Sequence, residues 1–251
     1  LHMAEGIHRH PSAGVLYSDE DKIDEQGRRY EPYFKPRFDP DLLLGQNCVS
    51  HLGVYRTDLM RAAGGFRKGY EGSQDWDLAL RCIERCGAEN VVHVPHVLYH
   101  WRSIEGSTAL AVSEKSYVVE AGRRAVADHL ARTGVVAEVQ ALVGGHLSVR
   151  RPLPSPAPQV SLVIPTRDRV DLLRQCVDSV LRRSTYPHFE ILVVDNHSVE
   201  PETQAYLESL ASEPRAKVLR YPHPFNYSAI NNFGVRHATG ELLCLLNNDI
   251  E

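Results

Sequence analysis

The most restrictive feature of the sequence is an alternation of apolar runs with amphipathic segments in its last third. Residues 160–164 read Val-Ser-Leu-Val-Ile, and further predicted strands cover residues 190–194 and 217–221. Continuous apolar runs of this length are typical of strands that are buried on both faces. Residues 171–183 and 202–212 lie between these runs and are predicted helices. This order predicts βαβ units and a Rossmann-like α/β fold, with a mixed, mainly parallel sheet flanked by helices.

The chain divides into three predicted segments. Residues 1–108 alternate short apolar runs with polar loops, and residues 159–251 hold the βαβ pattern. Residues 109–158 begin with a helix predicted for 113–133 and end in the proline-rich tract 151–158. Such a tract is an extended, semi-rigid spacer, so we expect 109–158 to be a helical and proline-rich linker.

Composition excludes several classes of protein. The 251 residues are 43% hydrophobic and 24% charged, with a formal net charge of -4, as in an ordinary globular protein. This charge gives no support for binding nucleic acid or an anionic membrane. Five cysteines without regular spacing do not form a disulfide framework. No apolar run approaches the ~18 residues of a membrane span. We therefore expect a cytoplasmic protein, which contacts the inner membrane face at most peripherally.

Both ends of the sequence read as though they lie inside larger elements. The first residues form an amphipathic helix pattern without a capping residue, and the apolar run 241–246 lies close to the last residue. The sequence therefore predicts a segment of a longer chain.

Polar residues follow three of the predicted strands in the last segment. They are Pro-Thr-Arg-Asp at 165–168, Asp-Asn-His-Ser at 195–198, and Asn-Asn-Asp at 247–249. Asp and Asn also end strands for reasons of turn geometry, but ligands bind at the carboxyl ends of strands in open α/β sheets. Together the three groups indicate a binding site. No glycine-rich loop follows the first strand, so neither a dinucleotide fold nor a P-loop is indicated.

These residues resemble the nucleotide-binding half of inverting, family-2-like glycosyltransferases with the GT-A fold. The resemblance implies that Pro165, Thr166 and Asp168 lie near the base and that Asp195 contacts the uracil or the ribose. The stretch from Asn226 to Gly234 also matches. Its Asn226 and Asn231 are expected to face the nucleotide-sugar, or alternatively to cap the start of a helix.

The resemblance also implies a metal. The family carries an Asp-x-Asp pair that holds Mn²⁺ or Mg²⁺ against the diphosphate, and its counterpart here is Asn247 and Asp249. The first position is an amide in this chain, which lowers the negative charge that faces the ion.

The first segment resembles the acceptor half of the same fold. Residues 71–81 read Glu-Gly-Ser-Gln-Asp-Trp-Asp-Leu-Ala-Leu-Arg and match an acidic helix start, with Gln74 in place of the family's Glu. The resemblance implies that Asp75 is the general base that deprotonates the acceptor hydroxyl. Alternatively, Asp75 and Asp77 merely stabilise a helix N-terminus through its dipole.

Several histidines follow this helix. Residues 91–102 contain His93, His96 and His100, which suggests a zinc site, but Pro95 and the β-branched residues favour an extended chain with His93 and His96 on opposite faces. The resemblance implies instead that His100 reaches the catalytic metal and that Arg102 lies near the diphosphate. A structural role for His100 remains an alternative. We interpret the acidic residues 19–21 as a polar turn.

The halves occur in permuted order, because the acceptor half precedes the nucleotide half. Either the chain is the back of one domain followed by the front of the next in a tandem glycosyltransferase, or the two halves pack as one permuted domain. In the second case the strand 160–164 and the strands of the first segment share one sheet. The expected function is polysaccharide biosynthesis by transfer of a sugar from a nucleotide-sugar donor to a glycan or other hydroxyl acceptor. The alternatives are a non-catalytic carbohydrate-binding or nucleotide-binding fragment and a nucleotidyltransferase.

Overall fold

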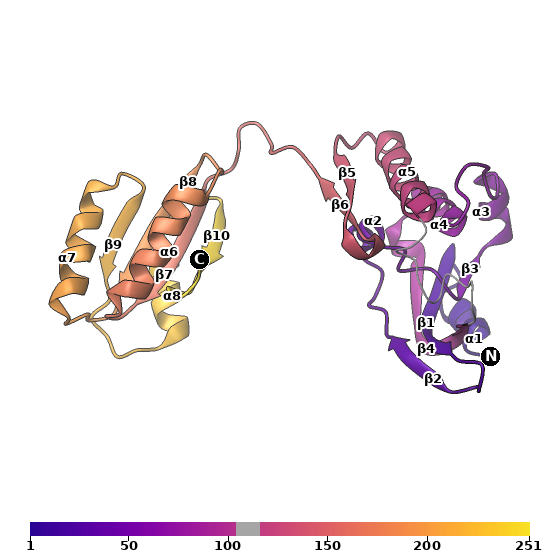
Figure 1. Cartoon of the computed structure of the whole chain (residues 1–251), viewed down its shortest axis with the longest axis horizontal. Coiled ribbons are helices and arrows are strands. Elements are labelled where there is room, and N and C mark those ends of the chain that lie inside the picture. Colours follow the sequence, from indigo (N-terminus) through magenta and orange to yellow (C-terminus); the bar gives the residue numbers. More distant parts are fainter. Residues whose placement is uncertain (104–115) are drawn as a thin grey trace. The chain divides into compact units, whose positions relative to one another are not determined.

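The structure is a computed structural model that describes residues 1–103 and 116–251. It contains two compact units, Leu1–Pro152 and Leu153–Glu251, which are described separately below (Figure 1). The segment boundary expected at residue 108 and the helix start expected at Ser113 lie outside the described residues.

The second unit is a parallel sheet with helices on both faces. Its strands are β7 (Val160–Thr166), β8 (Phe189–Asp195), β9 (Ala216–Arg220) and β10 (Leu242–Leu245), in the spatial order β10-β7-β8-β9. All of the pairings are parallel. This confirms the α/β fold with a mainly parallel sheet that the sequence predicts for this part of the chain.

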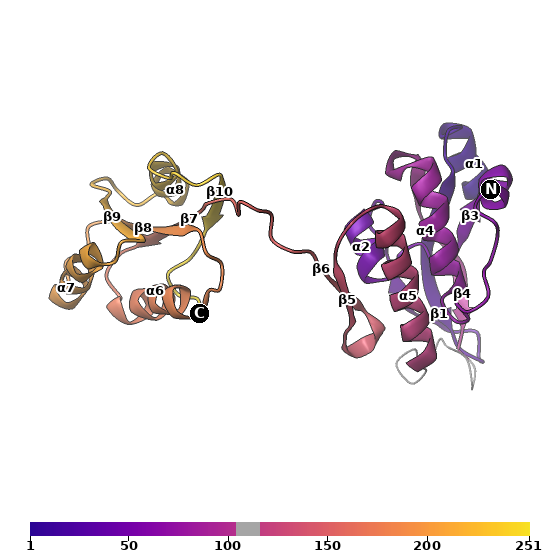
Figure 2. The ribbon, with the colours of Figure 1, turned by 90° about the horizontal axis from the view of Figure 1, so that it is seen from above.

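The helices of this unit cover the two faces of the sheet unequally. Figure 2 shows α6 (Val170–Arg183) and α7 (Pro201–Ser209) on one face and α8 (Tyr227–Val235) on the other. Neighbouring strand residues point to opposite faces. Ile164 and Val193 therefore pack in the core under α6 and α7, whereas Val163 and Val194 pack under α8. A single-turn 3₁₀ helix, Leu210–Ser212, follows α7.

The apolar run 241–246 contains β10. β10 is the edge strand of its sheet, and Leu242, Leu243 and Leu245 are each about half exposed in the described structure. An edge strand has a neighbour on one side only, so apolar composition alone does not place it in the core.

The first unit contains a mixed sheet around β1 (Val15–Ile23). Strand β4 (Val91–Arg102) runs parallel to β1 along its whole length. Strands β3 (Gly53–Tyr55) and β2 (Arg29–Tyr33) pair with the first and last parts of β1, both antiparallel. The helices, a two-stranded ribbon and two 3₁₀ turns complete this unit: α1 (His2–Arg9), α2 (Pro40–Gly45), α3 (Thr57–Ala62), α4 (Gln74–Cys86), α5 (Ser116–Arg132), β5 (Glu138–Ala141), β6 (Leu147–Arg150), Ala88–Asn90 and Val143–Gly145.

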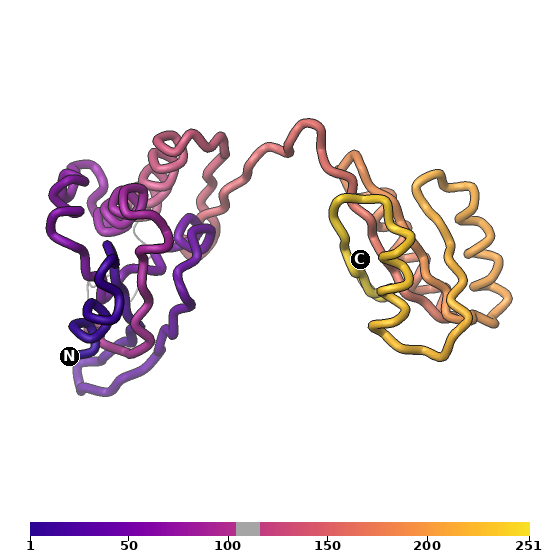
Figure 3. The backbone as a smooth tube through the Cα atoms, turned by 180° about the vertical axis from the view of Figure 1, so that it is seen from behind, coloured from indigo at the N-terminus to yellow at the C-terminus, as the bar shows by residue number. Residues whose placement is uncertain are grey.

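The strands pair within each unit, so the single sheet of the permuted arrangement is not confirmed. β7 pairs with β8 and β10, and β1 pairs with β2, β3 and β4. The physical reason lies in the segment expected to be a linker. Its helix α5 and ribbon β5–β6 contribute Val126, Leu130, Val139 and Leu147 to the core of the first unit. That core is therefore closed by its own chain, and the tube in Figure 3 shows only the proline-rich stretch as an extended connection. No helix among the described residues is long and apolar enough to cross a membrane.

Helix α8 approaches the sheet closely through Gly234. A Cβ atom at this position would lie 2.5 Å from Val163 Cγ1 and 3.0 Å from Val194 Cγ2. Both neighbours are buried β-branched residues in the sheet, where strain is difficult to relieve.

We predict that Gly234→Ala destabilises the second unit by roughly 1–2 kcal/mol, because overpacking costs up to about 3 kcal/mol and outweighs the gain of about 1 kcal/mol that alanine brings to a helix. Amide hydrogen exchange in β7 and β8 measures this effect. Asn232→Ala, at an exposed position of the same helix, is the control and should leave exchange unchanged or slower. Equal protection in Gly234→Ala and the wild type would contradict the close packing.

Candidate functional site

Polar residues gather at the carboxyl ends of β7, β8 and β10 in the second unit. A cavity of about 280 Å³ opens there, and Pro165, Thr166 and Asn247 are among the residues that line it. Asn248 Nδ2 donates a hydrogen bond to Thr166 Oγ1 at 3.1 Å, which ties the segment after β10 to the end of β7. The structure thus brings together three of the residues that the sequence predicts for nucleotide-sugar binding or metal ligation.

Two arginines line the same cavity, and the sequence analysis assigned them no role. Arg167 and Arg169 follow Thr166 in the loop between β7 and α6. Guanidinium groups are suited to phosphate oxygens because they donate several hydrogen bonds in one plane. The two arginines are visible in the run Pro-Thr-Arg-Asp-Arg. Arginines in a loop are common, however, and by themselves they do not indicate a phosphate site.

Asp195 lies at the end of β8 and is only 1% exposed. Its Oδ1 accepts the backbone N–H of Ser198 at 3.0 Å, and its Oδ2 pairs with Arg220 at the end of β9. These residues border a second cavity, of about 240 Å³. Asp195 and Arg220 are directly opposite each other in the parallel register, a relation that a sequence does not display. Arg220 is therefore a second polar group at this cavity that the sequence analysis missed.

Asp168 is engaged within the protein. Its φ of 53° is in the left-handed region, and its Oδ1 accepts the backbone N–H groups of Val199 at 2.6 Å and Glu200 at 2.9 Å. Its own N–H donates to Ser198 Oγ at 2.7 Å. The side chain thus joins the loop after β7 to the start of α7, a structural role that the sequence analysis did not foresee.

The asparagines of α8 also bond within the helix. Asn226 is the N-cap of α8, and its Oδ1 accepts a hydrogen bond from the N–H of Ala229 at 2.9 Å. This is the helix-capping role that the sequence analysis gave as an alternative. Asn231 is buried, and Nδ2 donates to Tyr227 O at 2.8 Å. The described residues provide no partner for its Oδ1, nor for Oδ1 of buried Asn196. Buried amide oxygens normally have a partner, so these two atoms have unused hydrogen-bonding capacity.

The predicted metal ligands are divided between the two units. Asn247 and Asp249 follow β10 and are exposed, whereas His100 belongs to β4 of the first unit. The described residues contain no group of three or more His, Cys, Asp or Glu side chains placed to hold an ion. A carboxylate and an amide oxygen nevertheless fit Mg²⁺ or Mn²⁺, which takes most of its ligands from phosphates and water in such sites.

Asp75 borders a cavity of the first unit. It stands in the first turn of α4, and Asn47 Nδ2 donates a hydrogen bond to its Oδ2 at 2.9 Å. The cavity has a volume of about 840 Å³, and its lining includes the aromatic residues Tyr55, Trp76 and Trp101. Burial, and then the charge of Asp75, raise the pKa of the Tyr55 hydroxyl. A carboxylate beside aromatic surfaces is suited to bind a hydroxyl-bearing ligand.

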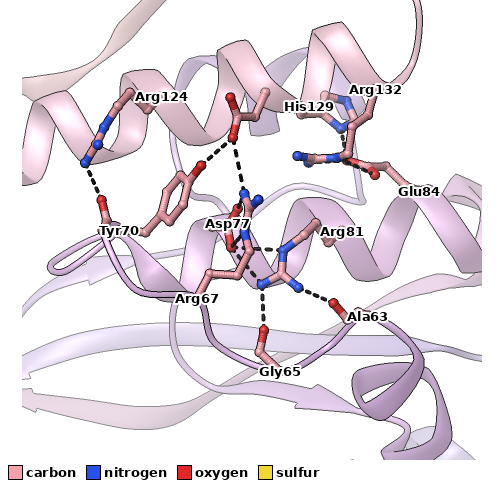
Figure 4. A network of polar contacts seen from close by, with 12 residues as sticks. Ala63, Gly65, Arg67, Tyr70, Asp77, Arg81, Glu84, Arg124, His129 and Arg132 are labelled. Atoms are coloured by element: carbon pink, nitrogen blue, oxygen red, sulfur yellow. Dashed lines mark hydrogen bonds and ion pairs between the residues drawn. The ribbon is translucent and has the colours of Figure 1, made fainter.

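Asp77 points away from this cavity, since residues two apart lie on opposite sides of a helix. Its side chain is fully buried between Arg67 and Arg81 (Figure 4). Arg81 also donates to Ala63 O and, at 2.7 Å, to Gly65 O. The idea that Asp77 serves only the helix dipole is therefore wrong, because its carboxylate bonds to two guanidinium groups.

The acidic residues 19–21 are not a turn. They lie within β1 and are buried: histidines of β4 pair with Asp19 and Asp21, and Lys35 pairs with Glu20. His93 Nε2 is 2.7 Å from Asp19 Oδ1, and His100 Nδ1 pairs with Asp21. Burial opposes ionisation of Asp21, but His100 and Arg29 outweigh it and hold its pKa below the ordinary value. One ring nitrogen of His100 is thus already used, which favours the structural alternative for this residue. Arg102, the last residue of β4, is exposed.

We predict that Asp77→Asn destabilises the first unit by roughly 3–5 kcal/mol, because it leaves the buried Arg81 without its counter-ion. Both tryptophans, Trp76 and Trp101, lie in this unit, so their fluorescence in urea reports its unfolding alone. The control Glu120→Gln breaks an exposed ion pair with Arg123 and should change the urea concentration at the midpoint of unfolding little.

The same network predicts a dependence on pH. Burial raises the pKa of Asp77, but hydrogen bonds from Arg67 and Arg81 lower it by more, so its pKa in the folded protein is below the usual value. Its contribution to stability is complete above the unfolded pKa of about 4 and is lost as the pH falls through the folded pKa. The difference between wild type and Asp77→Asn should therefore shrink below pH 4. A constant difference at all pH values would contradict the ion pairs.

Comparison with known proteins supports a relation to glycosyltransferases. Residues 161–251 match the model of the family Glycosyl transferase family 2. The uncharacterized protein y4gI of Sinorhizobium fredii is 46% identical over 98% of the chain, and the O-antigen biosynthesis protein RfbC of Myxococcus xanthus is 44% identical over 96%. The chain spans 27% and 19% of the lengths of these two relatives.

A solved structure is similar to part of the chain. The mannosyltransferase PcManGT from Pyrobaculum calidifontis, in complex with GDP-Man and Mn²⁺, matches 39% of this chain and 29% of its own at 25% identity, with a TM-score of 0.35.

Proposed function

We propose that this chain, whose residues 161–251 carry glycosyl transferase family 2 sequence, takes part in transferring a sugar from a nucleotide-sugar to a hydroxyl group. The observation that supports this best is the carboxyl edge of the parallel sheet in the second unit. There Thr166, Asp195 and Asn247 border two neighbouring cavities, within the part of the chain that matches the family. The edge of an open parallel sheet is the usual ligand site of such folds.

The second unit is proposed to bind the donor. Arg167 and Arg169 supply positive charge for the diphosphate, and the Asp195–Arg220 pair offers both an acceptor and a donor to the polar edge of a base. Asn226, Asn231 and Asp168 stabilise the walls of this region. Asp249, with Asn247, is proposed to hold Mn²⁺ or Mg²⁺, which when bound neutralises charge that develops on the leaving diphosphate.

The first unit is proposed to bind an acceptor at its own cavity beside Asp75, as the acceptor-side half of a glycosyltransferase domain. Asp75 takes the proton of the acceptor hydroxyl while that oxygen attacks the anomeric carbon and the bond to the diphosphate oxygen breaks. This single displacement inverts the anomeric configuration and requires one carboxylate within hydrogen-bond reach of the hydroxyl. His100 is proposed to reach a catalytic metal and Arg102 to lie near a diphosphate, as the family resemblance implies.

The acceptor-side half, proposed for residues 1–108, precedes the donor half, proposed for residues 159–251. Because the chain spans a minor part of its two relatives, we propose that it belongs to a tandem glycosyltransferase that builds a polysaccharide. All five cysteines are free in the structure, which is compatible with the proposed cytoplasmic location.

We predict that Asp249→Asn removes the dependence of nucleoside-diphosphate binding on Mn²⁺, because only the neutral amide oxygens of residues 247 and 249 then face the ion. Calorimetric titration with UDP and GDP, each with and without Mn²⁺, measures this. The control Glu208→Gln changes an exposed carboxylate of α7 and should bind like the wild type. Full Mn²⁺ dependence in Asp249→Asn would move the metal to another ligand.

We predict that Asp75→Asn lowers transfer by at least about 100-fold and leaves donor affinity within a few-fold, since a general base acts on the acceptor. Transfer is measured in the full-length protein, with Glu71→Gln as the matched control at an exposed position before α4. Equal small losses in both variants would exclude Asp75 as the base. Metal-dependent binding without any turnover in the wild type would favour a non-catalytic binding module.

A further inference from the structure

Asn47 has a defined orientation beside Asp75. It lies between α2 and β3, and its two amide atoms have different partners. Oδ1 accepts the N–H of Ser50 at 3.1 Å, and Nδ2 donates to Asp75 Oδ2 at 2.9 Å. The opposite orientation of the amide would direct an oxygen at the carboxylate and an NH₂ group at the N–H, so only this one satisfies both bonds.

The segment that carries Asn47 is held by a buried ion pair. Lys35 Nζ is fully buried and donates to Val49 O at 3.2 Å and His51 O at 2.8 Å. It also pairs with Glu20 Oε2 at 3.3 Å, and the same oxygen accepts the N–H of His51 at 3.2 Å. Several bonds thus fix the backbone that follows Asn47, and a rigid support is what accurate placement of a reacting group requires.

The contrast between Asp75 and Asp77 indicates what this arrangement does. Asp77 is neutralised by two guanidinium groups, whereas Asp75 is held by a neutral amide that leaves its charge in place. Among the described residues, none donates a hydrogen bond to Asp75 Oδ1. Oδ2 is therefore held in the protein, and Oδ1 is available on a half-buried side chain that lines the cavity.

We propose that Asn47 is a positioning residue that orients the carboxylate of Asp75 and presents its Oδ1 to the acceptor hydroxyl. This inference rests on the proposed role of Asp75 as the base. Asn47 does not touch the reacting atoms, and it acts only through Asp75.

Asn47→Asp is the sharpest test, because it keeps the shape and the acceptor for Ser50 but replaces the donor that Asp75 uses. We expect kcat for transfer in the full-length protein to fall by about 10- to 100-fold, with the KM for the acceptor within a few-fold. Two adjacent carboxyls share a proton as the pH falls, so the introduced group then donates to Asp75 again. The loss should thus be smaller at pH 5 than at pH 8, relative to the wild type at each pH.

Two further variants separate positioning from folding. Asn47→Ser keeps an acceptor near Ser50 without adding charge, and we expect it to lower kcat without the recovery at low pH. Asn90→Asp makes the same chemical change at a half-buried amide that bonds to Cys86 O, outside the cavity, and should leave kcat unchanged. Tryptophan fluorescence of the 251-residue chain in urea checks that the first unit remains folded in each variant.

The outcomes distinguish the two proposals. If Asp75→Asn loses transfer while Asn47→Asp and Asn47→Ser keep it, the positioning role is overturned and the base remains. If Asp75→Asn keeps transfer, the base is wrong and the positioning role fails with it. A fall in kcat that merely follows a loss of folded protein would also overturn the positioning role.

Discussion

The first unit depends on the buried ion pairs of Asp77. The carboxylate of Asp77, two residues after Asp75, pairs with Arg67 and Arg81. Arg81 also donates hydrogen bonds to the backbone carbonyls of Ala63 and Gly65. These bonds hold one face of helix α4 in place, and so they also orient the side chains on its opposite face. Asp75 lines the aromatic cavity from the other side of the same helix. Stability and the proposed chemistry are thus coupled through a single helical turn.

The second unit depends on a different constraint, which is the parallel arrangement of its strands. Parallel strands bring their carboxyl ends to one edge, so residues 25 to 82 positions apart become neighbours there. Thr166 and Asn248 share a hydrogen bond for this reason, as do Asp195 and Arg220. Charge of both signs is concentrated at this edge, which suits a ligand that joins an anionic diphosphate to a polar base.

The sequence predicts local features better than contacts. The βαβ pattern predicted the parallel sheet, because the alternation of strands and helices is periodic along the chain. The position of Asp195 was predicted because it directly follows an apolar strand. Arg220 could not be predicted from periodicity, because its role depends on strand register. Asn47 is 28 residues before Asp75 and joins it only through the tertiary fold. The interpretation of residues 19–21 as a turn failed because β1 continues through them and pairs with β4, which lies far along the sequence. Helix α5 was assigned to a linker because its docking surface is not visible in its own sequence.

The central claim is that donor and metal bind at the carboxyl edge of the second sheet. Paramagnetic broadening of backbone amide resonances by Mn²⁺ together with UDP or GDP tests this claim most directly. The account predicts that substoichiometric Mn²⁺ broadens the amides of Thr166, Asp195 and Asn248 only when the nucleotide is present. With diamagnetic Mg²⁺ and the nucleotide, it predicts that the resonances of the same amides shift without broadening. Broadening centred on Asp21 and His100 instead, or none in the second unit with either nucleotide, would contradict it.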